Sequence, residues 1–199
     1  MSGDELREGT AGGTGCSGAG LLVFVVGPSG AGKDTLLSYA RQRLAERGDI
    51  VFARRRITRA SDHTEDHLSL DGDTFERGVA EGRFPLYWRA NGLGYALGED
   101  VAAGIANGNV VVANGSRAAV ALARHLFARV KVVLVTAPPE VLAARISARG
   151  REGGEAAAQR LAREPRIDIP PDLILINDGG VEQAGERLTA FLRGLGAEG

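Results

Sequence analysis

The stretch "GPSGAGKD", Gly27 to Asp34, decides the fold of this chain. It follows "LLVFVV" (Leu21 to Val26), an apolar run of strand length, and it opens a helical pattern. A buried strand, a glycine-rich turn and a helix in this order predict a phosphate-binding loop of the type G-x-x-x-x-G-K-[ST]. Gly27, Gly30 and Gly32 permit the tight turn in which successive N–H groups face a phosphate, with the positive end of the helix behind them.

The loop predicts a nucleotide-binding site. Lys33 is expected to reach the β and γ phosphates and to act in catalysis. The nucleotide contacts are expected from Gly27, Pro28, Ser29, Gly30, Ala31, Gly32, Lys33, Asp34 and Thr35.

Asp34 departs from the usual pattern, because a carboxylate stands where a hydroxyl residue normally helps to hold Mg²⁺. A carboxylate about 4 Å from a phosphate charge is repelled by about 4 kcal/mol at an effective dielectric of 20, whereas a helix N-terminus returns only about 0.3 to 1 kcal/mol. A metal ion reverses this balance, since Mg²⁺ accepts one or two carboxylates plus phosphate oxygens. We therefore expect Asp34 to hold Mg²⁺, directly or through water, with Thr35 as the alternative ligand.

A second strand supports this hypothesis. Many such folds place a metal-binding Asp at the end of a neighbouring apolar strand. Here the best candidate strand, "VVVANGSR", ends in Asn114. Asp34 is then expected to supply the carboxylate that this strand lacks.

Strand and helix patterns alternate along most of the chain, with apolar runs at 110–113, 131–137 and 173–176 that each precede a helical pattern. This alternation predicts an α/β fold of the P-loop NTPase type, a parallel sheet flanked by helices, with ligands beyond the carboxyl ends of the strands. The helix that begins after the loop is expected to stop at Gly48.

Two polar segments interrupt the alternation within one kinase domain, residues 20–199. Residues 51–98 are turn-rich, and we expect a guanylate-kinase-like, acceptor-binding insertion beside the core sheet. Residues 149–168 are Arg-rich, and we expect a closing lid. The Gly-rich residues 1–19 are expected to form a disordered tail.

The composition of the chain bears on its binding partners and its cellular compartment. A net charge of −1 gives no basic field for nucleic acid, and no apolar run approaches the roughly 20 residues of a membrane span. The single cysteine gives no internal disulfide, and the start lacks a secretory signal, so we expect the cytoplasm. A small-molecule substrate is the expected partner, and a homodimer is left open.

Of the 24 basic residues, only Lys33 and Lys131 are lysines. One interpretation is codon bias with solvated arginines, and we expect it to hold for Arg54, Arg55 and Arg56. In the lid, arginines can instead neutralise charge on a transferred phosphoryl group. The lid arginines expected to do so are Arg149, Arg151, Arg160 and Arg163.

From Leu21 to Leu195 the chain resembles the guanylate-kinase-type nucleoside monophosphate kinases. The motifs are "GPSGAGK", "ITRA" followed by Glu65, "FERGVAEGRF", an aromatic stretch ending near Tyr95, "ARG" at the lid, and "IND". In that family the corresponding Arg and Tyr bind the acceptor phosphate, which implies this role for Arg59 and Tyr95. The family's two guanine-reading acids are missing, because "FPLYW" (84–88) and Asn114 stand in their places, so GMP is a poor candidate acceptor.

A subfamily fits better, the ribose 1,5-bisphosphate phosphokinases of phosphonate breakdown. The chain is similar to it in "GPSGAGKD", "ITR", "EDH", "WRANGLGYALG", "NGSR", "RGRE", "RLAR" and "NDG". The resemblance implies transfer of the γ-phosphoryl group of ATP, with Mg²⁺, to the 1-phosphate of ribose 1,5-bisphosphate. The products are 5-phosphoribosyl 1-diphosphate (PRPP) and ADP. Because the nucleophile is an ionised phosphate oxygen, no general base is required.

The resemblance also guides the expected substrate contacts. They are Arg59, Glu65, His67, Asn91, Tyr95, Asn114, Ser116, Arg117 and Arg163. Asn91, Asn114 and Ser116 are candidates for the ribose hydroxyls, and His67 for the sugar or a phosphate. Trp88 is expected to pack in the core.

Other functions stay open. A guanylate kinase or another nucleoside monophosphate kinase with relaxed base recognition is the nearest alternative. A guanylate-kinase-like interaction module can dispense with Lys33 and the lid arginines, which this chain has. A regulatory GTPase is disfavoured because the chain has no N-K-x-D motif.

Overall fold

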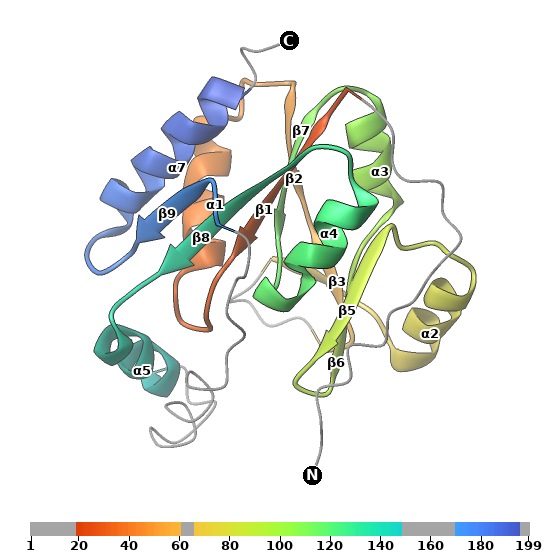
Figure 1. Cartoon of the computed structure of the whole chain (residues 1–199). Coiled ribbons are helices and arrows are strands. Elements are labelled where there is room, and N and C mark those ends of the chain that lie inside the picture. The colour runs from red at the N-terminus through yellow and green to blue at the C-terminus, as the bar shows by residue number, and fades with distance from the viewer. Residues whose placement is uncertain (1–18, 61–65, 149–169, 196–199) are drawn as a thin grey trace.

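A computed structural model describes residues 19–60, 66–148 and 170–195 (Figure 1). The core elements are β1 (Leu21–Val26), α1 (Lys33–Arg43), β2 (Ile50–Ala53), α3 (Glu99–Ala106), β7 (Val110–Asn114), a 3₁₀ turn (Arg117–Ala119), α4 (Val120–Leu126), β8 (Val130–Thr136), α5 (Pro139–Ala148), β9 (Leu173–Ile176) and α7 (Val181–Leu195). Between β2 and α3 lie β3 (Arg55–Ile57), β4 (His67–Ser69), α2 (Gly72–Ala80), β5 (Leu86–Ala90) and β6 (Leu93–Leu97).

The central sheet has five strands in the order β2-β7-β1-β8-β9, and every neighbouring pair is parallel. The predicted α/β fold is confirmed. The strand before the phosphate loop is β1, which lies in the middle of this sheet. Its carboxyl end is flanked by the ends of β7 and β8, so residues that follow these three strands are brought to one edge.

The two faces of β1 enter two separate cores, as expected for a strand that is apolar at every position. Val23 and Val25 pack in a cluster with α1 and α7, while Leu22 and Phe24 pack in a cluster with α3 and α4. Figure 1 shows these helix pairs on opposite sides of the sheet. Helices α1 and α7 touch at Gly185, where an added Cβ would lie 2.4 Å from the Tyr39 ring.

A second sheet, with strand order β4-β3-β6-β5, stands beside the core (Figure 1). Strands β3 and β4 are parallel, and β6 is antiparallel to both β3 and β5. Helix α2 accompanies this sheet and begins at Asp71, whose carboxylate accepts a hydrogen bond of 2.7 Å from the Thr74 N–H. The second sheet lies within the predicted insertion (residues 51–98). Residues 51–53 belong to β2 of the core sheet, so the insertion begins after them.

Helix α1 ends at Arg43, so the prediction of an end at Gly48 is wrong. The Leu44 N–H still bonds to the Ala40 carbonyl at 3.0 Å, and the chain then turns tightly, with the Arg47 N–H on the Leu44 carbonyl at 2.9 Å. The Arg47 guanidinium donates two hydrogen bonds, of 2.7 and 2.6 Å, to the Asp49 carboxylate. Gly48 does not have the positive φ of a helix-terminating glycine.

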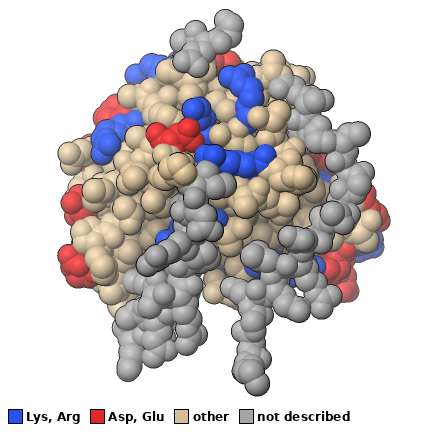
Figure 2. Space-filling view, in the orientation of Figure 1, with Lys and Arg blue, Asp and Glu red and all other residues tan. Residues whose placement is uncertain are grey.

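The core packing of Trp88 is confirmed, since this residue is 5% exposed and meets Phe24 edge to face with ring centroids 6.1 Å apart. No helix in the described part of the chain is long and apolar enough to cross a membrane. Where described residues form the face shown in Figure 2, basic and acidic side chains are interspersed. Residues 1–18 of the predicted tail (1–19) and the whole predicted lid (149–168) lie outside the described residues.

Candidate active site

The phosphate loop connects β1 to α1, and its glycines have the backbone that the sequence predicts. Gly27, Gly30 and Gly32 have φ values of 148°, 81° and 86°. An added Cβ at Gly27 would lie 1.9 Å from the Val135 carbonyl oxygen, and one at Gly32 would lie 2.4 Å from Nδ2 of Asn177. The loop therefore needs glycine both for its turns and for its close approach to β8 and to the end of β9.

Asn177 and Arg145 brace this loop, and sequence reasoning gave neither of them a role in the site. The Asn177 side chain donates a hydrogen bond of 2.8 Å to the Ala31 carbonyl. Arg145, on α5, donates to the Asn177 carbonyl at 2.9 Å and to the Gly30 carbonyl at 3.5 Å. A usable signal was present, because Asn177 directly follows an apolar strand, at the sheet edge where parallel α/β folds bind ligands.

Lys33 and Asp34 begin α1, and their side chains have different partners. The Lys33 ammonium folds back and donates to the Gly27 and Pro28 carbonyls at 2.7 and 3.0 Å. The Asp34 carboxylate accepts a hydrogen bond of 2.7 Å from Nδ2 of Asn114 at the end of β7. Asn114, at the strand position where many such folds have a metal-binding Asp, is thus in direct contact with Asp34, the acid at the end of the phosphate loop.

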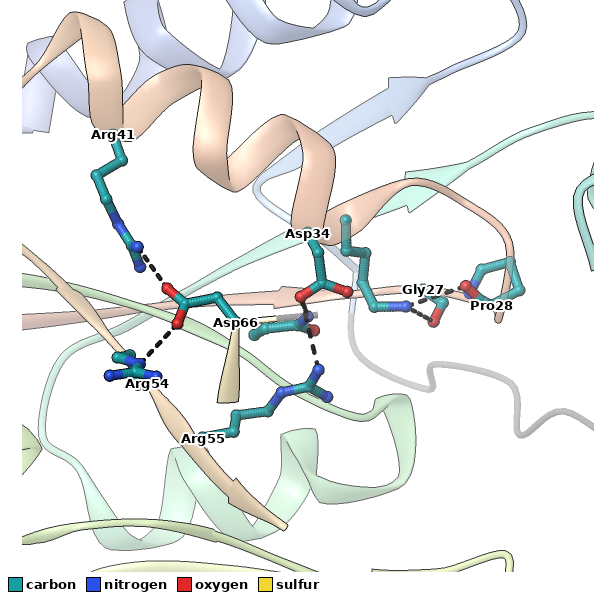
Figure 3. A network of polar contacts seen from close by, with 9 residues as sticks. Gly27, Pro28, Asp34, Arg41, Arg54, Arg55 and Asp66 are labelled. Carbon is teal, nitrogen blue, oxygen red and sulfur yellow. Dashed lines mark hydrogen bonds and ion pairs between the residues drawn. The ribbon is translucent and has the colours of Figure 1, made fainter. Parts of the chain in front are cut away.

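Arg55 approaches the same carboxylate oxygen of Asp34, with Nη2 3.6 Å from Oδ1 (Figure 3). Its side chain is 10% exposed, so the prediction of a solvated Arg55 is wrong. Side chains alternate along an extended chain, which turns Arg55 inward between Arg54 and Arg56. These two remain nearer the surface, where Arg54 pairs with an Asp66 oxygen at 2.6 Å and Arg56 with Asp100 at 2.9 Å.

The residues around Asp34 fit a metal ion that arrives with a nucleotide. In the described ranges no group of three or more His, Cys, Asp or Glu side chains could hold a metal on its own. Among the described residues, Asn114 and Arg55 both contact Asp34 at Oδ1, which leaves Oδ2 for a cation. Oδ1 of Asn114 is buried without a hydrogen-bond partner among the described residues, and Thr35 is exposed beside Asp34 on α1. One carboxylate with few further oxygens suits Mg²⁺, which commonly takes its other ligands from water and phosphate.

The second sheet brings several predicted acceptor residues near this edge. Arg59 follows β3, and His67 in β4 is the register partner of Arg55. His67 is 2% exposed, and neither of its ring nitrogens has a hydrogen-bond partner among the described residues. Tyr95 in β6 stacks on Trp88 with ring centroids 5.5 Å apart and planes 3° apart. Buried polar atoms of this kind are costly without a partner, so His67 is suited to a polar ligand.

The segment after β7 carries two more of these residues. Ser116 precedes the 3₁₀ turn, and Arg117 begins it. Burial lowers the pKa of the Arg117 guanidinium from its usual value, which indicates a cation with reduced hydration. Such a cation gains from an anionic ligand such as a phosphate.

Asn91 has a structural explanation of its own. It forms the two-residue turn of the β5–β6 hairpin with Gly92, and the two φ values are 52° and 72°. A type I′ hairpin turn requires positive φ at both positions and favours Asn-Gly there. Its contact with ribose stays a prediction, since the turn alone accounts for this residue.

Asp66 ties the start of β4 to the helix that follows the phosphate loop (Figure 3). Its carboxylate accepts a hydrogen bond from Arg41 of α1 and pairs with Arg54. Burial alone would raise the pKa of Asp66, but the two arginines outweigh it and hold this pKa below its usual value. The acceptor segment and the loop helix are thus joined by charged contacts.

Five of the predicted site residues lie outside the described residues. They are Glu65, Arg149, Arg151, Arg160 and Arg163. Their roles stay predictions.

Comparison with known proteins shows which proteins this chain is similar to. Residues 22–164 match the family model described as an AAA domain. The ribose 1,5-bisphosphate phosphokinase PhnN of Methylobacterium radiotolerans is 53% identical, over 87% of this chain and 98% of that protein. A protein of the same name from Laribacter hongkongensis is 50% identical over 87% of this chain, which spans 42% of that longer protein. A crystal structure of guanylate kinase from Anaplasma phagocytophilum shares the fold, with a TM-score of 0.65, 18% identity, and coverage of 88% of this chain and 85% of that one.

Proposed function

Since this chain belongs to the ribose 1,5-bisphosphate phosphokinase family, we propose that it transfers the γ-phosphoryl group of ATP to the 1-phosphate of ribose 1,5-bisphosphate, giving PRPP and ADP. The chain is a kinase with a P-loop. The observation that carries the choice of substrate is the identity of 53% over nearly the whole length of one relative. Mg²⁺ as the metal, the cytoplasm as the compartment and phosphonate breakdown as the metabolic context belong to the same proposal.

The phosphate loop supplies the donor half of the site. Its backbone is held by Asn177 and Arg145, so the N–H groups of the turn are fixed before the triphosphate binds. Lys33 gives up its two loop carbonyls and places its charge on the β and γ phosphates. Mg²⁺, held by Asp34 and with Thr35 as the alternative ligand, would neutralise phosphate charge and align the transferred group.

The second sheet and the segment after β7 supply the acceptor half. Arg59, Arg117 and Tyr95 bind the acceptor's phosphates, with Glu65 and Arg163 as further predicted contacts. Asn114 accepts a hydrogen bond from a ribose hydroxyl through Oδ1, Ser116 accepts or donates one through its hydroxyl, and His67 completes the polar lining. Because the hairpin turn accounts for Asn91, our proposal for the ribose does not depend on it.

Catalysis in this proposal is alignment and charge neutralisation. The attacking oxygen belongs to a phosphate that is already ionised at neutral pH, so no side chain has to remove a proton. Arg149, Arg151 and Arg160 of the predicted lid supply further positive charge to the transferred group. The buried His67 therefore serves binding, and its protonation is not part of the chemistry.

The nearest alternative is a nucleoside monophosphate kinase, and the described site disfavours it. Position 114 is an asparagine and has no carboxylate that could accept hydrogen bonds from guanine. Its amide N–H is also already bonded to Asp34. In the segment 84–88, the Leu86 and Trp88 side chains are core residues that are 1% and 5% exposed. A pocket that lacks both acids loses several kcal/mol of hydrogen bonding to guanine.

Initial rates of ADP formation test the choice of acceptor. ATP and Mg²⁺ are supplied with either ribose 1,5-bisphosphate or GMP, and kcat/KM is compared. We expect ribose 1,5-bisphosphate to exceed GMP by at least about a thousandfold, which corresponds to about 4 kcal/mol. Equal values, or a higher value for GMP, would overturn the proposed substrate.

A further inference from the structure

Asp34 and Asn114 are 80 positions apart and meet through one hydrogen bond of 2.7 Å. The usual arrangement in P-loop enzymes has a hydroxyl residue at the loop position and a metal-binding Asp on a neighbouring strand. This chain has the acid on the loop and an amide on the strand, and the structure places the two side chains in direct contact. Compared with the usual arrangement, the carboxylate is therefore at the loop position instead of the strand position, and its uncharged polar partner is on the strand.

Asn114 is built to orient the Asp34 carboxylate. It is 4% exposed, and Nδ2 can donate to Asp34 only while Oδ1 points away. Two carboxylates at this separation would repel each other, whereas an amide donor stabilises one carboxylate. Arg55 contacts the same oxygen, Oδ1, and compensates its charge. The Asn114 hydrogen bond orients the carboxylate through Oδ1 and leaves Oδ2 to face a cation, as hydrogen-bond partners of metal-ligating carboxylates do.

We propose that Asp34 and Asn114 form one interchangeable metal-positioning pair, in which Asn114 holds the ligating carboxylate of Asp34 and in which acid and amide can be exchanged between the two positions. This inference rests on the proposed role of Asp34 at the metal of the nucleotide. It assigns to Asn114 a positioning role for the donor side of the reaction, in addition to the ribose contact left to Oδ1.

The test is an exchange of side chains, read out as metal affinity rather than activity. The double variant Asp34→Asn/Asn114→Asp keeps the number of side-chain heavy atoms and the net charge, and it is designed to reverse the direction of the hydrogen bond. Affinity of Mn²⁺ for the complex of enzyme and a non-hydrolysable ATP analogue is measured by electron paramagnetic resonance. We compare the wild type, Asp34→Asn, the exchange variant, and the matched control Asp34→Asn/Asn114→Ala.

Asp34→Asn is expected to raise the Mn²⁺ Kd about tenfold to a hundredfold, the range of a charge-assisted contact. The exchange variant is expected to return to within about threefold of the wild type, and the Asn114→Ala control is not. Equal Kd values for the exchange variant and that control would overturn the inference, with the metal role of Asp34 intact. Wild-type affinity in Asp34→Asn itself would instead refute that metal role.

Folding of each variant is followed by circular dichroism and thermal melting. If the exchange variant does not fold, Asp34→Ser/Asn114→Asp replaces it, since this pair recreates the usual hydroxyl and strand acid. Asp34→Ser alone is then the reference. Asp34→Ser/Asn114→Asp is expected to return the Mn²⁺ Kd to within about threefold of the wild type. A Kd equal to that of Asp34→Ser alone would overturn the inference.

Discussion

Replacing Asn177 by alanine tests whether the phosphate loop is held in place from outside. Asn177 is 6% exposed, and its amide donates to the carbonyl of Ala31, a fully buried residue. Alanine removes the donor and leaves this carbonyl without its partner, which costs about 1 to 3 kcal/mol. For a domain of this size each kcal/mol lowers the melting temperature by about 2 to 4 °C, so we expect a fall of roughly 2 to 12 °C.

The functional effect should be confined to the donor side. A loop that is no longer preorganised binds the triphosphate more weakly, so the KM for ATP is expected to rise about tenfold while the KM for the acceptor stays unchanged. Asn177→Asp should raise the KM for ATP further, because it keeps the size but cannot donate and adds negative charge beside the loop.

Asn107→Ala, at an exposed position after α3, is the matched control. Calorimetry and initial-rate kinetics on the three variants give both readouts. Wild-type melting temperature and wild-type KM for ATP in Asn177→Ala would refute the bracing role.

Three further predictions concern the site and its link to the rest of the fold. Lys33→Met is expected to lower kcat by a factor on the order of 10² to 10³, measured with saturating substrates, and an unchanged kcat would exclude Lys33 from catalysis. Trp88 is the chain's single tryptophan and stacks on Tyr95, so acceptor binding should change its fluorescence; no change with ribose 1,5-bisphosphate would argue against Tyr95 as an acceptor contact. Asp66 has a lowered pKa, so its pairing energy is present above about pH 4 and is lost as pH falls through the folded-state value. Asp66→Asn should therefore lower stability at pH 7 by less than about 1 kcal/mol, because the side chain is 43% exposed, and the difference from wild type should vanish in acid unfolding below pH 4; a constant difference would show that the charge is not responsible.

The sequence predicted the parts of the fold that depend on local patterns. The strand before the loop has the predicted bounds, because an unbroken apolar run between two glycines, Gly20 and Gly27, indicates a buried strand with turns at both ends. The positive φ values of Gly27, Gly30 and Gly32 were predictable for the same reason, since the glycine spacing is a local signal. The end of α1 was missed because a side-chain pair, Arg47 with Asp49, accompanies the turn that replaces the helix-terminating glycine.

Contacts between distant positions were not predictable in the same way. Asn114 and Asp34 were linked in the sequence only by a missing acid, and the hydrogen bond between them is a property of the β1–β7 pairing that brings their segments together. Arg55 was predicted to be solvated because three consecutive arginines give no sign of which one turns inward. Asn177 lies 146 positions from the loop residue it binds, so its bracing contact depends on the sheet order.

The central claim is that a sugar phosphate, and not a nucleotide, accepts the phosphoryl group. Phosphorus NMR of a reaction with ATP, Mg²⁺ and ribose 1,5-bisphosphate tests it most directly, with a parallel reaction containing GMP. We expect new coupled diphosphate resonances of PRPP together with those of ADP in the first reaction, and no GDP in the second. GDP formation in the second reaction, with the 1-phosphate resonance of ribose 1,5-bisphosphate unchanged in the first, would contradict the proposed function.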